Sequence, residues 1–282
     1  MKAQNIFTLG RPVEKDYLTN QLIVLITAIV FIAGIIIHLF RQNSLQNSFV
    51  FGILISIIIF FTWALAREIF PQGEYASLAA SVVCFLGLIY YGITPLVLLV
   101  LLWLTICLRL INQTTGLKPS LVDRVIVFIL SIICAYVLSW ILVFVLVLVF
   151  IVDYLFSKEK SDIVFMIAAI CSIPIIILLN DLWYNTSQLN LINILPVILL
   201  LVAFIVAMWF LRNITVLGDN SQKKVPVSRI LSAQIVSIIF CSLYFIWSGD
   251  AGFVELIPLW CIFASSIVFS PIELFLNRKK GS

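Results

Sequence analysis

The sequence has few charged residues. Only 11% of its 282 residues are Asp, Glu, Lys or Arg, whereas 63% are hydrophobic and the mean hydropathy is +1.21. Soluble domains carry roughly 25% charged residues, and a soluble domain with this composition would aggregate through its exposed apolar surface. The composition therefore excludes a soluble globular protein and predicts an integral membrane protein.

Histidine and clustered cysteine are also scarce. The chain has one histidine, His38, and six cysteines in separate apolar runs, none closer than twenty residues to the next. Because neither a CxxC metal site nor a disulfide framework has this pattern, we expect buried thiols and no cofactor or metal. Charged residues deep in the apolar runs are scarce too. This argues against carboxylate proton relays, intramembrane metalloproteases and enzymes that hold magnesium with clustered aspartates.

Long apolar runs follow one another along the chain. A membrane-spanning helix needs about 20 apolar residues, within a range of roughly 17–25. We predict an all-α bundle of about ten transmembrane helices over the ranges 21–40, 49–66, 77–92, 95–111, 121–137, 139–156, 162–179, 191–211, 228–247 and 256–276. They make a single transmembrane domain over 21–276, after a cytoplasmic N-terminal segment over 1–20 and before a basic cytoplasmic tail over 277–282.

The uncharged stretch from Val125 to Val152 decides the number of spans. As one helix its 28 residues would be about 42 Å long, against a hydrocarbon core of about 30 Å. A hairpin that turns near Tyr136 and Ser139 gives ten spans and places 16 of the 17 basic residues on one side, leaving Arg41 on the other. One long helix divides them 7 against 10. Because cytoplasmic loops carry the excess of Lys and Arg, we predict the hairpin, with both termini cytoplasmic.

A weak internal similarity recurs at a spacing of 42 to 44 residues. ALAREIFPQGEYAS at 64–77 aligns with CLRLINQTTGLKPS at 107–120, so that Arg67 matches Arg109. A period of two spans keeps the orientation and predicts parallel two-helix repeats. The alternative is that any apolar chain with alternating loops resembles itself at such spacings.

Three prolines lie inside the last four spans. Pro174, Pro196 and Pro271 remove backbone hydrogen bonds, and interrupted helices often line transport sites. This half of the bundle is therefore the expected moving part. Alternatively, the mildly polar residues there, such as Gln234 and Ser237, serve close helix packing.

The strongest candidate site lies at the predicted inner face. We predict that cations and hydroxyl groups near the ends of the second, fourth and fifth spans bind an anion or a lipid headgroup; they are Arg67, Arg109, Arg124, Lys118, Thr114 and Thr115. Guanidinium groups bind phosphate or carboxylate through paired hydrogen bonds, and we expect Arg67 and Arg109 to converge. If a nearby carboxylate lies between the two arginines, the cluster is a structural clamp. The candidate carboxylates are Glu68, Glu74 and Asp123. The other alternative is plain anchoring at the membrane surface.

Ten spans with short loops leave no room for a soluble domain. We therefore expect a transporter, permease or binder of a small, weakly charged or lipid-like solute in the plasma (inner) membrane. One alternative is a membrane enzyme that acts on a lipid-linked phosphate at the inner leaflet, and another is a structural subunit of a membrane complex. The expected partners are the bilayer and anionic headgroups at the inner face, with partner subunits or a homo-oligomer left open. We interpret the net charge of +4 as a sign of how the chain is oriented in the membrane, and not as a sign of a nucleic-acid partner.

Overall fold

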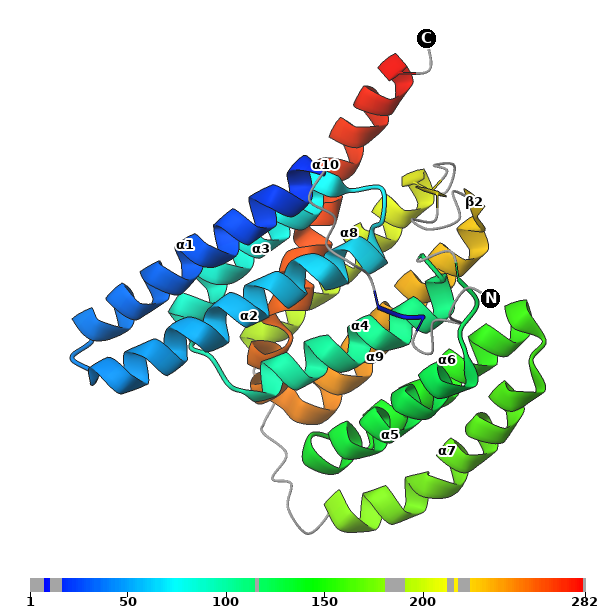
Figure 1. Cartoon of the computed structure of the whole chain (residues 1–282). Helices are drawn as coiled ribbons and strands as arrows, with labels where there is room; N and C mark the ends of the chain where they lie inside the picture. The colour runs from blue at the N-terminus through cyan, green and yellow to red at the C-terminus, as the bar shows by residue number, and fades with distance from the viewer. Residues whose placement is uncertain are drawn as a thin grey trace, which may run out of the picture. The chain divides into compact units, whose positions relative to one another are not determined.

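The computed structural model describes residues 8–10, 17–114, 117–180, 191–211, 216–217 and 224–280. These residues form ten helices and one pair of two-residue strands. The helices are α1 (Leu18–Phe40), α2 (Leu45–Ile69), α3 (Glu74–Tyr91), α4 (Leu96–Asn112), α5 (Leu121–Val137), α6 (Ile141–Ser157), α7 (Lys160–Asn180), α8 (Leu191–Leu211), α9 (Val227–Glu255) and α10 (Ile257–Lys280). The antiparallel strands are β1 (Val216–Leu217) and β2 (Lys224–Val225). The all-α class is confirmed (Figure 1).

Five helices of the described chain are long and apolar enough to cross a membrane, namely α1, α2, α3, α7 and α9. Shorter apolar helices of 10–17 residues lie in α4, α6, α8 and α10. By length and composition these helices are those of a membrane-embedded protein. The count of ten spans and the side on which the termini lie stay predictions.

The long uncharged stretch forms two helices, as its length predicted. α5 ends at Val137 and α6 begins at Ile141. The N–H of Leu138 still reaches the carbonyl of Cys134 at 2.8 Å, and the Ser139 hydroxyl accepts from the Ile141 N–H at 3.3 Å. At this turn the Ser139 side chain is fully buried, while Tyr136 is 49% exposed.

Two compact units divide the chain, and each is described by itself. Unit 1 comprises Met1–Arg11, Leu102–Ile194 and Arg212–Phe253, and unit 2 comprises Pro12–Leu101, Leu195–Leu211 and Val254–Ser282. Unit 1 thus contains α5, α6, α7 and most of α4 and α9. Unit 2 contains α1, α2, α3, α10 and most of α8.

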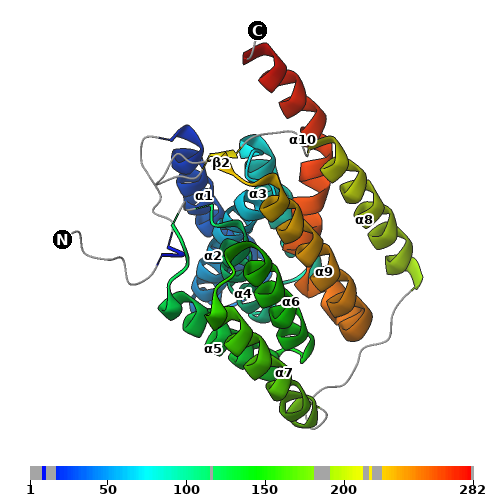
Figure 2. The same cartoon turned by 90° about the vertical axis from the view of Figure 1, so that its right-hand side faces the viewer.

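Aromatic side chains join the helices of unit 1. α5, α6 and α7 lie side by side (Figures 1 and 2), and the Phe165 ring of α7 packs 5.8 Å from Phe128 and 5.5 Å from Phe150. Trp103 of α4 donates to the Ser131 hydroxyl of α5 at 2.7 Å and packs 5.0 Å from the Phe240 ring of α9. Trp103 is fully buried, and this bond satisfies its indole N–H.

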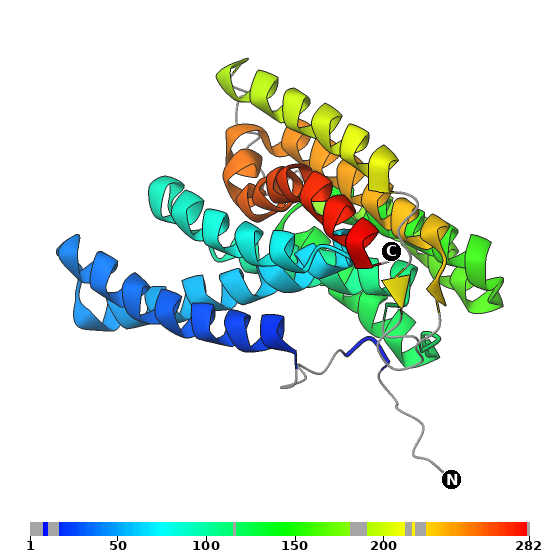
Figure 3. The same ribbon diagram turned by 90° about the horizontal axis from the view of Figure 1, so that it is seen from above.

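Small residues join the helices of unit 2. α1 and α2 lie side by side (Figures 1 and 3), and a Cβ built on Gly52 would stand 2.9 Å from the Phe31 carbonyl. A Cβ on Gly34 would meet the Ile55 side chain at 2.8 Å. The absence of a side chain at both glycines therefore lets the two backbones approach closely.

α9 is interrupted near its end. Gly249 has φ 59° and ψ −137°, a backbone conformation that is essentially confined to glycine. The predicted span stopped at residue 247, whereas the helix runs to Ser248 and resumes after Gly249 as far as Glu255. Asn193 of α8 donates to the Asp250 carboxylate at 2.9 Å, immediately after the break.

Candidate functional site

Four charged side chains of unit 1 are buried together. They lie where α4 and α6 end and where α5, α7 and α9 begin, and they are Arg124, Asp153, Asp162 and Arg229. Their residues are 3%, 0%, 0% and 7% exposed. Two cations and two anions leave the network neutral, which matters because a single unpaired charge is strongly unfavourable away from water.

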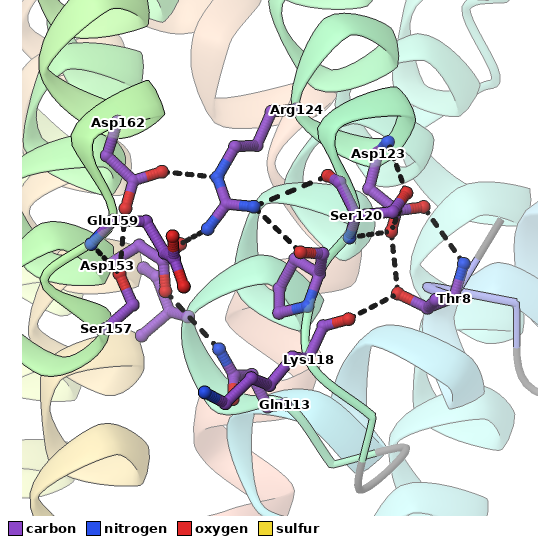
Figure 4. Close-up of polar contacts among 12 residues, drawn as sticks. Thr8, Gln113, Lys118, Ser120, Asp123, Arg124, Asp153, Ser157, Glu159 and Asp162 are labelled. Carbon is purple, nitrogen blue, oxygen red and sulfur yellow. Dashed lines mark hydrogen bonds and ion pairs between the residues drawn. The ribbon is translucent and has the colours of Figure 1, made fainter. Parts of the chain in front are cut away.

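Arg124 is the centre of this network (Figure 4). Its Nε donates to Asp162 of α7, and its Nη2 donates to Asp153 of α6 at 3.1 Å. Its Nη1 donates to the Pro119 carbonyl at 2.7 Å. One guanidinium of α5 thus fixes α6, α7 and the loop before its own helix.

The second oxygen of Asp153 connects the network to α4 and α9. Arg229 Nη1 and Gln113 Nε2 both donate to Asp153 Oδ1, each at 3.4 Å. The same Arg229 nitrogen also donates to the Ile111 carbonyl at 2.7 Å, and its guanidinium lies 4.9 Å from the Phe156 ring centroid. Asp153 is therefore shared between two arginines from different helices.

Asp162 owes its position to a tight turn between α6 and α7. Lys158 adopts the left-handed conformation with φ 58°, which ends α6. The Ser157 hydroxyl then donates to Asp162 Oδ2 at 2.8 Å and accepts from the Glu159 N–H at 3.2 Å. Both carboxylate oxygens of Asp162 are used, one by Ser157 and one by Arg124.

Asp123 begins α5 and has a different partner from the one expected. It forms a capping box with Ser120: its Oδ2 accepts from the Ser120 N–H at 2.7 Å, and the Ser120 hydroxyl accepts from the Asp123 N–H at 3.2 Å. The Thr8 N–H donates to Asp123 Oδ1 at 3.0 Å and the Thr8 hydroxyl donates to Oδ2 at 2.6 Å. These contacts join Thr8 to the beginning of α5.

Residues 8–10 form a strap on this end of unit 1. Thr8 binds Asp123 of α5, while the Leu9 carbonyl accepts from Arg109 Nη1 of α4 at 3.1 Å. The Thr8 hydroxyl also reaches the Lys118 carbonyl at 3.3 Å (Figure 4), and the Leu9 side chain is only 2% exposed. The strap is thus attached to two helices, at residues 100 and 115 positions further along the chain.

The predicted site residues divide between the two units. Arg67 belongs to unit 2, where its Nη1 lies 3.6 Å from the Glu74 carboxylate, and Arg109 belongs to unit 1. The convergence of these two arginines stays a prediction. Glu68 is buried in unit 2.

The remaining predicted residues lie in the loop that follows α4. Thr114 is 3% exposed and Lys118 is exposed at the surface. Thr115 lies outside the described residues. Within the described part of the chain, no group of three or more His, Cys, Asp and Glu side chains is arranged to hold a metal ion.

Sequence reasoning found Arg124 but missed its partners. Asp153 and Asp162 lie nine positions apart on either side of a short turn, next to Lys158 and Lys160. The count of basic residues that oriented the helices does not consider acidic residues. Two aspartates within or at the edge of predicted spans were nevertheless a signal that basic side chains had to face them. Thr8 and Gln113 carried no signal of this kind.

Comparisons of the chain with known proteins identified no relative. No protein-family model, curated protein or solved structure matches the chain.

Proposed function

We propose that the chain crosses the membrane ten times, with both termini in the cytoplasm, and transports or binds a small, weakly charged or lipid-like solute. The observation that favours this function over phosphate chemistry is the pairing of Arg124. A guanidinium that holds a phosphate needs donors open to the ligand. Those of Arg124 point to Asp162, Asp153 and Pro119, and the residue is 3% exposed.

The other arginines give the enzyme alternative little additional support. Arg67 faces Glu74 at 3.6 Å, and the guanidinium of Arg109 donates to the Leu9 carbonyl at 3.1 Å. Acidic and carbonyl oxygens therefore take the place that a substrate phosphate would occupy. Lys118 is exposed and suits contact with an anionic lipid headgroup in the proposed orientation.

Interrupted helices support movement of a solute rather than a purely structural role. α9 breaks at Gly249, and α7, α8 and α10 contain Pro174, Pro196 and Pro271. Breaks of this kind leave backbone groups without helical partners, and such groups often bind a substrate or absorb a helix movement.

A ligand screen on the full chain tests this function. The purified protein in detergent is heated with neutral, singly charged and lipid-like solutes, and in parallel with inorganic phosphate and a lipid-linked phosphate. We expect a solute of the first group to raise Tm, because a ligand that binds only the folded state stabilises it. Turnover of the lipid-linked phosphate would overturn the proposal in favour of the enzyme.

The proposed topology has its own test. Tyr136→Cys places a thiol at an exposed position of the α5–α6 turn, and we expect a membrane-impermeant reagent to label it from outside intact cells. Labelling only after permeabilisation would contradict the ten-span arrangement. Tyr75→Cys, 53% exposed near the start of α3, is the matched control and should show the opposite accessibility.

A further inference from the structure

The helices of unit 1 form two sets around the Arg124 network. Arg124 joins α5 to α6 and to α7 through Asp153 Oδ2 at 3.1 Å and through Asp162. Arg229 joins α9 to α4 through the Ile111 carbonyl at 2.7 Å. We call the boundary between α4 and α9 on one side and α5, α6 and α7 on the other the seam.

Near the network, two long hydrogen bonds cross the seam. Gln113, just after α4, and Arg229, in α9, both donate to Asp153 Oδ1 at 3.4 Å. Protein N–H···O bonds are usually 2.7–3.2 Å long, so both are weak. The contacts within each set, at 2.7 and 3.1 Å, are shorter.

Separation at the seam would break one ion pair of the network, that of Arg229 with Asp153, and would leave each of the two groups with another hydrogen-bond partner. Asp153 would keep Arg124 on its Oδ2, and Arg229 would keep the Ile111 carbonyl. A break between Arg124 and its aspartates would instead leave a buried guanidinium and two buried carboxylates without their main counter-ions. The seam is therefore the boundary at which this end of unit 1 separates most easily.

The strap of residues 8–10 crosses the same seam. Thr8 binds Asp123 on α5, and Leu9, the next residue, accepts from Arg109 on α4. Two adjacent residues thus bind one helix from each set. The 2.6 Å bond from the Thr8 hydroxyl to Asp123 is stronger than either bond to Asp153 Oδ1.

We propose that the seam is a gate at this end of unit 1 and that the strap holds it shut. Release of Thr8 from Asp123 lets the ends of α4 and α9 near the network move away from α5, α6 and α7. Asp153 Oδ1 is the acceptor that is given up, while the 2.7 Å bond from Trp103 of α4 to Ser131 of α5 stays in place further along the helices. The inference rests on the proposed function, since a gate of this kind serves passage of a solute.

A native thiol reports the opening of the seam. Cys107 of α4 is fully buried beside Ser131 and Cys134 of α5, so that it faces the seam. The full chain in liposomes is treated with a charged methanethiosulfonate, and the labelling rate of each cysteine is followed by mass spectrometry. The variant combines Thr8→Pro, which removes both the hydroxyl and the N–H that Asp123 accepts, with Gln113→Leu.

We expect Cys107 to be labelled at least several-fold faster in this double variant than in the unchanged protein. Ser157→Ala is the matched control, because it removes a 2.8 Å bond to Asp162 inside the α5–α7 set and should leave the Cys107 rate unchanged. Cys84, buried in unit 2, reports global unfolding.

Two results would overturn the gate. An unchanged Cys107 rate would show that the strap does not hold the seam. An equal acceleration at Cys84 would show that the substitutions loosen the whole fold. Because labelling needs no solute, either result leaves the ligand screen to decide the proposed function separately.

Discussion

The two units hold their helices together by different means. Unit 1 places Arg124, Arg229 and two aspartates in its interior and joins five helices through them. Unit 2 joins α1 to α2 where Gly34 and Gly52 let the backbones meet. A hydrogen bond between charged groups has a preferred direction, and such groups can exchange partners in a small number of ways. Close packing of apolar side chains has no preferred direction of this kind and offers no exchange of partners. The Arg124 network of unit 1 is therefore suited to a discrete rearrangement, and the α1–α2 pair of unit 2 to a fixed arrangement.

Two polar contacts between α2 and α3 of unit 2 are mild. The Thr62 hydroxyl lies 3.6 Å from the Cys84 thiol, and the Ser81 hydroxyl donates to the Ile59 carbonyl at 3.4 Å. Its Arg67–Glu74 ion pair is long, at 3.6 Å, and is open to water on the Glu74 side, since the Glu74 side chain is 49% exposed and that of Arg67 15%. An ion pair that water screens on one side is expected to contribute roughly 1 kcal/mol.

The comparison predicts its largest effect at Arg124. Arg124→Leu removes the main counter-ion of two buried aspartates and should lower the free energy of unfolding by about 3–5 kcal/mol. Denaturant titration in detergent measures the loss. Arg67→Leu in unit 2 is the matched control and should cost less than about 1 kcal/mol; equal losses would remove the distinction between the units.

The close crossing of α1 and α2 predicts the next largest effect. In Gly52→Ala the new Cβ would stand 2.7 Å from an Ile35 side-chain atom and 2.9 Å from the Phe31 carbonyl, so the helices must separate. We expect a loss of about 1–3 kcal/mol, the usual cost of overpacking. Gly87→Ala meets only one side-chain atom, at 3.0 Å, and should cost less in the same titration. Tolerance of alanine at Gly52 would contradict the packing described for unit 2.

The strap predicts a smaller effect that is confined to unit 1. Thr8→Val removes the hydroxyl that Asp123 accepts at 2.6 Å and should destabilise the fold by about 1–2 kcal/mol. Hydrogen exchange at the amide of residue 8, which donates to Asp123 Oδ1 at 3.0 Å, should accelerate, while that of α1 in unit 2 stays unchanged. Thr27→Val, which removes only a bond to the Ile23 carbonyl within α1, is the control.

The smallest change in stability is expected for substitutions of arginines at helix ends, which should instead change activity. Arg67→Ala and Arg109→Ala are each expected to impair solute binding or transport more than Lys279→Ala, since Lys279 lies near the end of α10. Arg67→Ala should do so with a stability loss below about 1 kcal/mol. The Tm shift caused by an identified solute measures this, and equal effects of the three variants would reduce both arginines to surface anchors.

Much of the fold could be predicted from the sequence because the length of each apolar run indicates the length of the helix that it forms. Each of the ten predicted ranges contains a helix, and the distribution of basic residues correctly divided the stretch 125–152 into α5 and α6. The interruption at Gly249 was not predicted, because the run of helical residues resumes after one glycine.

The candidate site could be predicted only in part. A cation at a helix end is visible in the sequence, and Arg124 was identified for that reason. Its pairing with Asp153 and Asp162 depends on how α5, α6 and α7 pack, which no local spacing encodes. Asp123 was one of three candidate carboxylates for a clamp. It caps α5 and binds the hydroxyl and N–H of Thr8, a contact between distant parts of the chain that no local spacing predicts.

A double-mutant cycle between Arg124 and Asp162 tests the central claim most directly. The account predicts that Arg124→Leu and Asp162→Leu are each strongly destabilising, and that the double variant loses less free energy of unfolding than the sum of the two single losses, by about 1–3 kcal/mol. That result would establish a closed clamp that holds α5 to α7. Additive losses, or an Arg124→Leu variant as stable as the unchanged protein, would contradict the claim and return Arg124 to the candidates for an anion site.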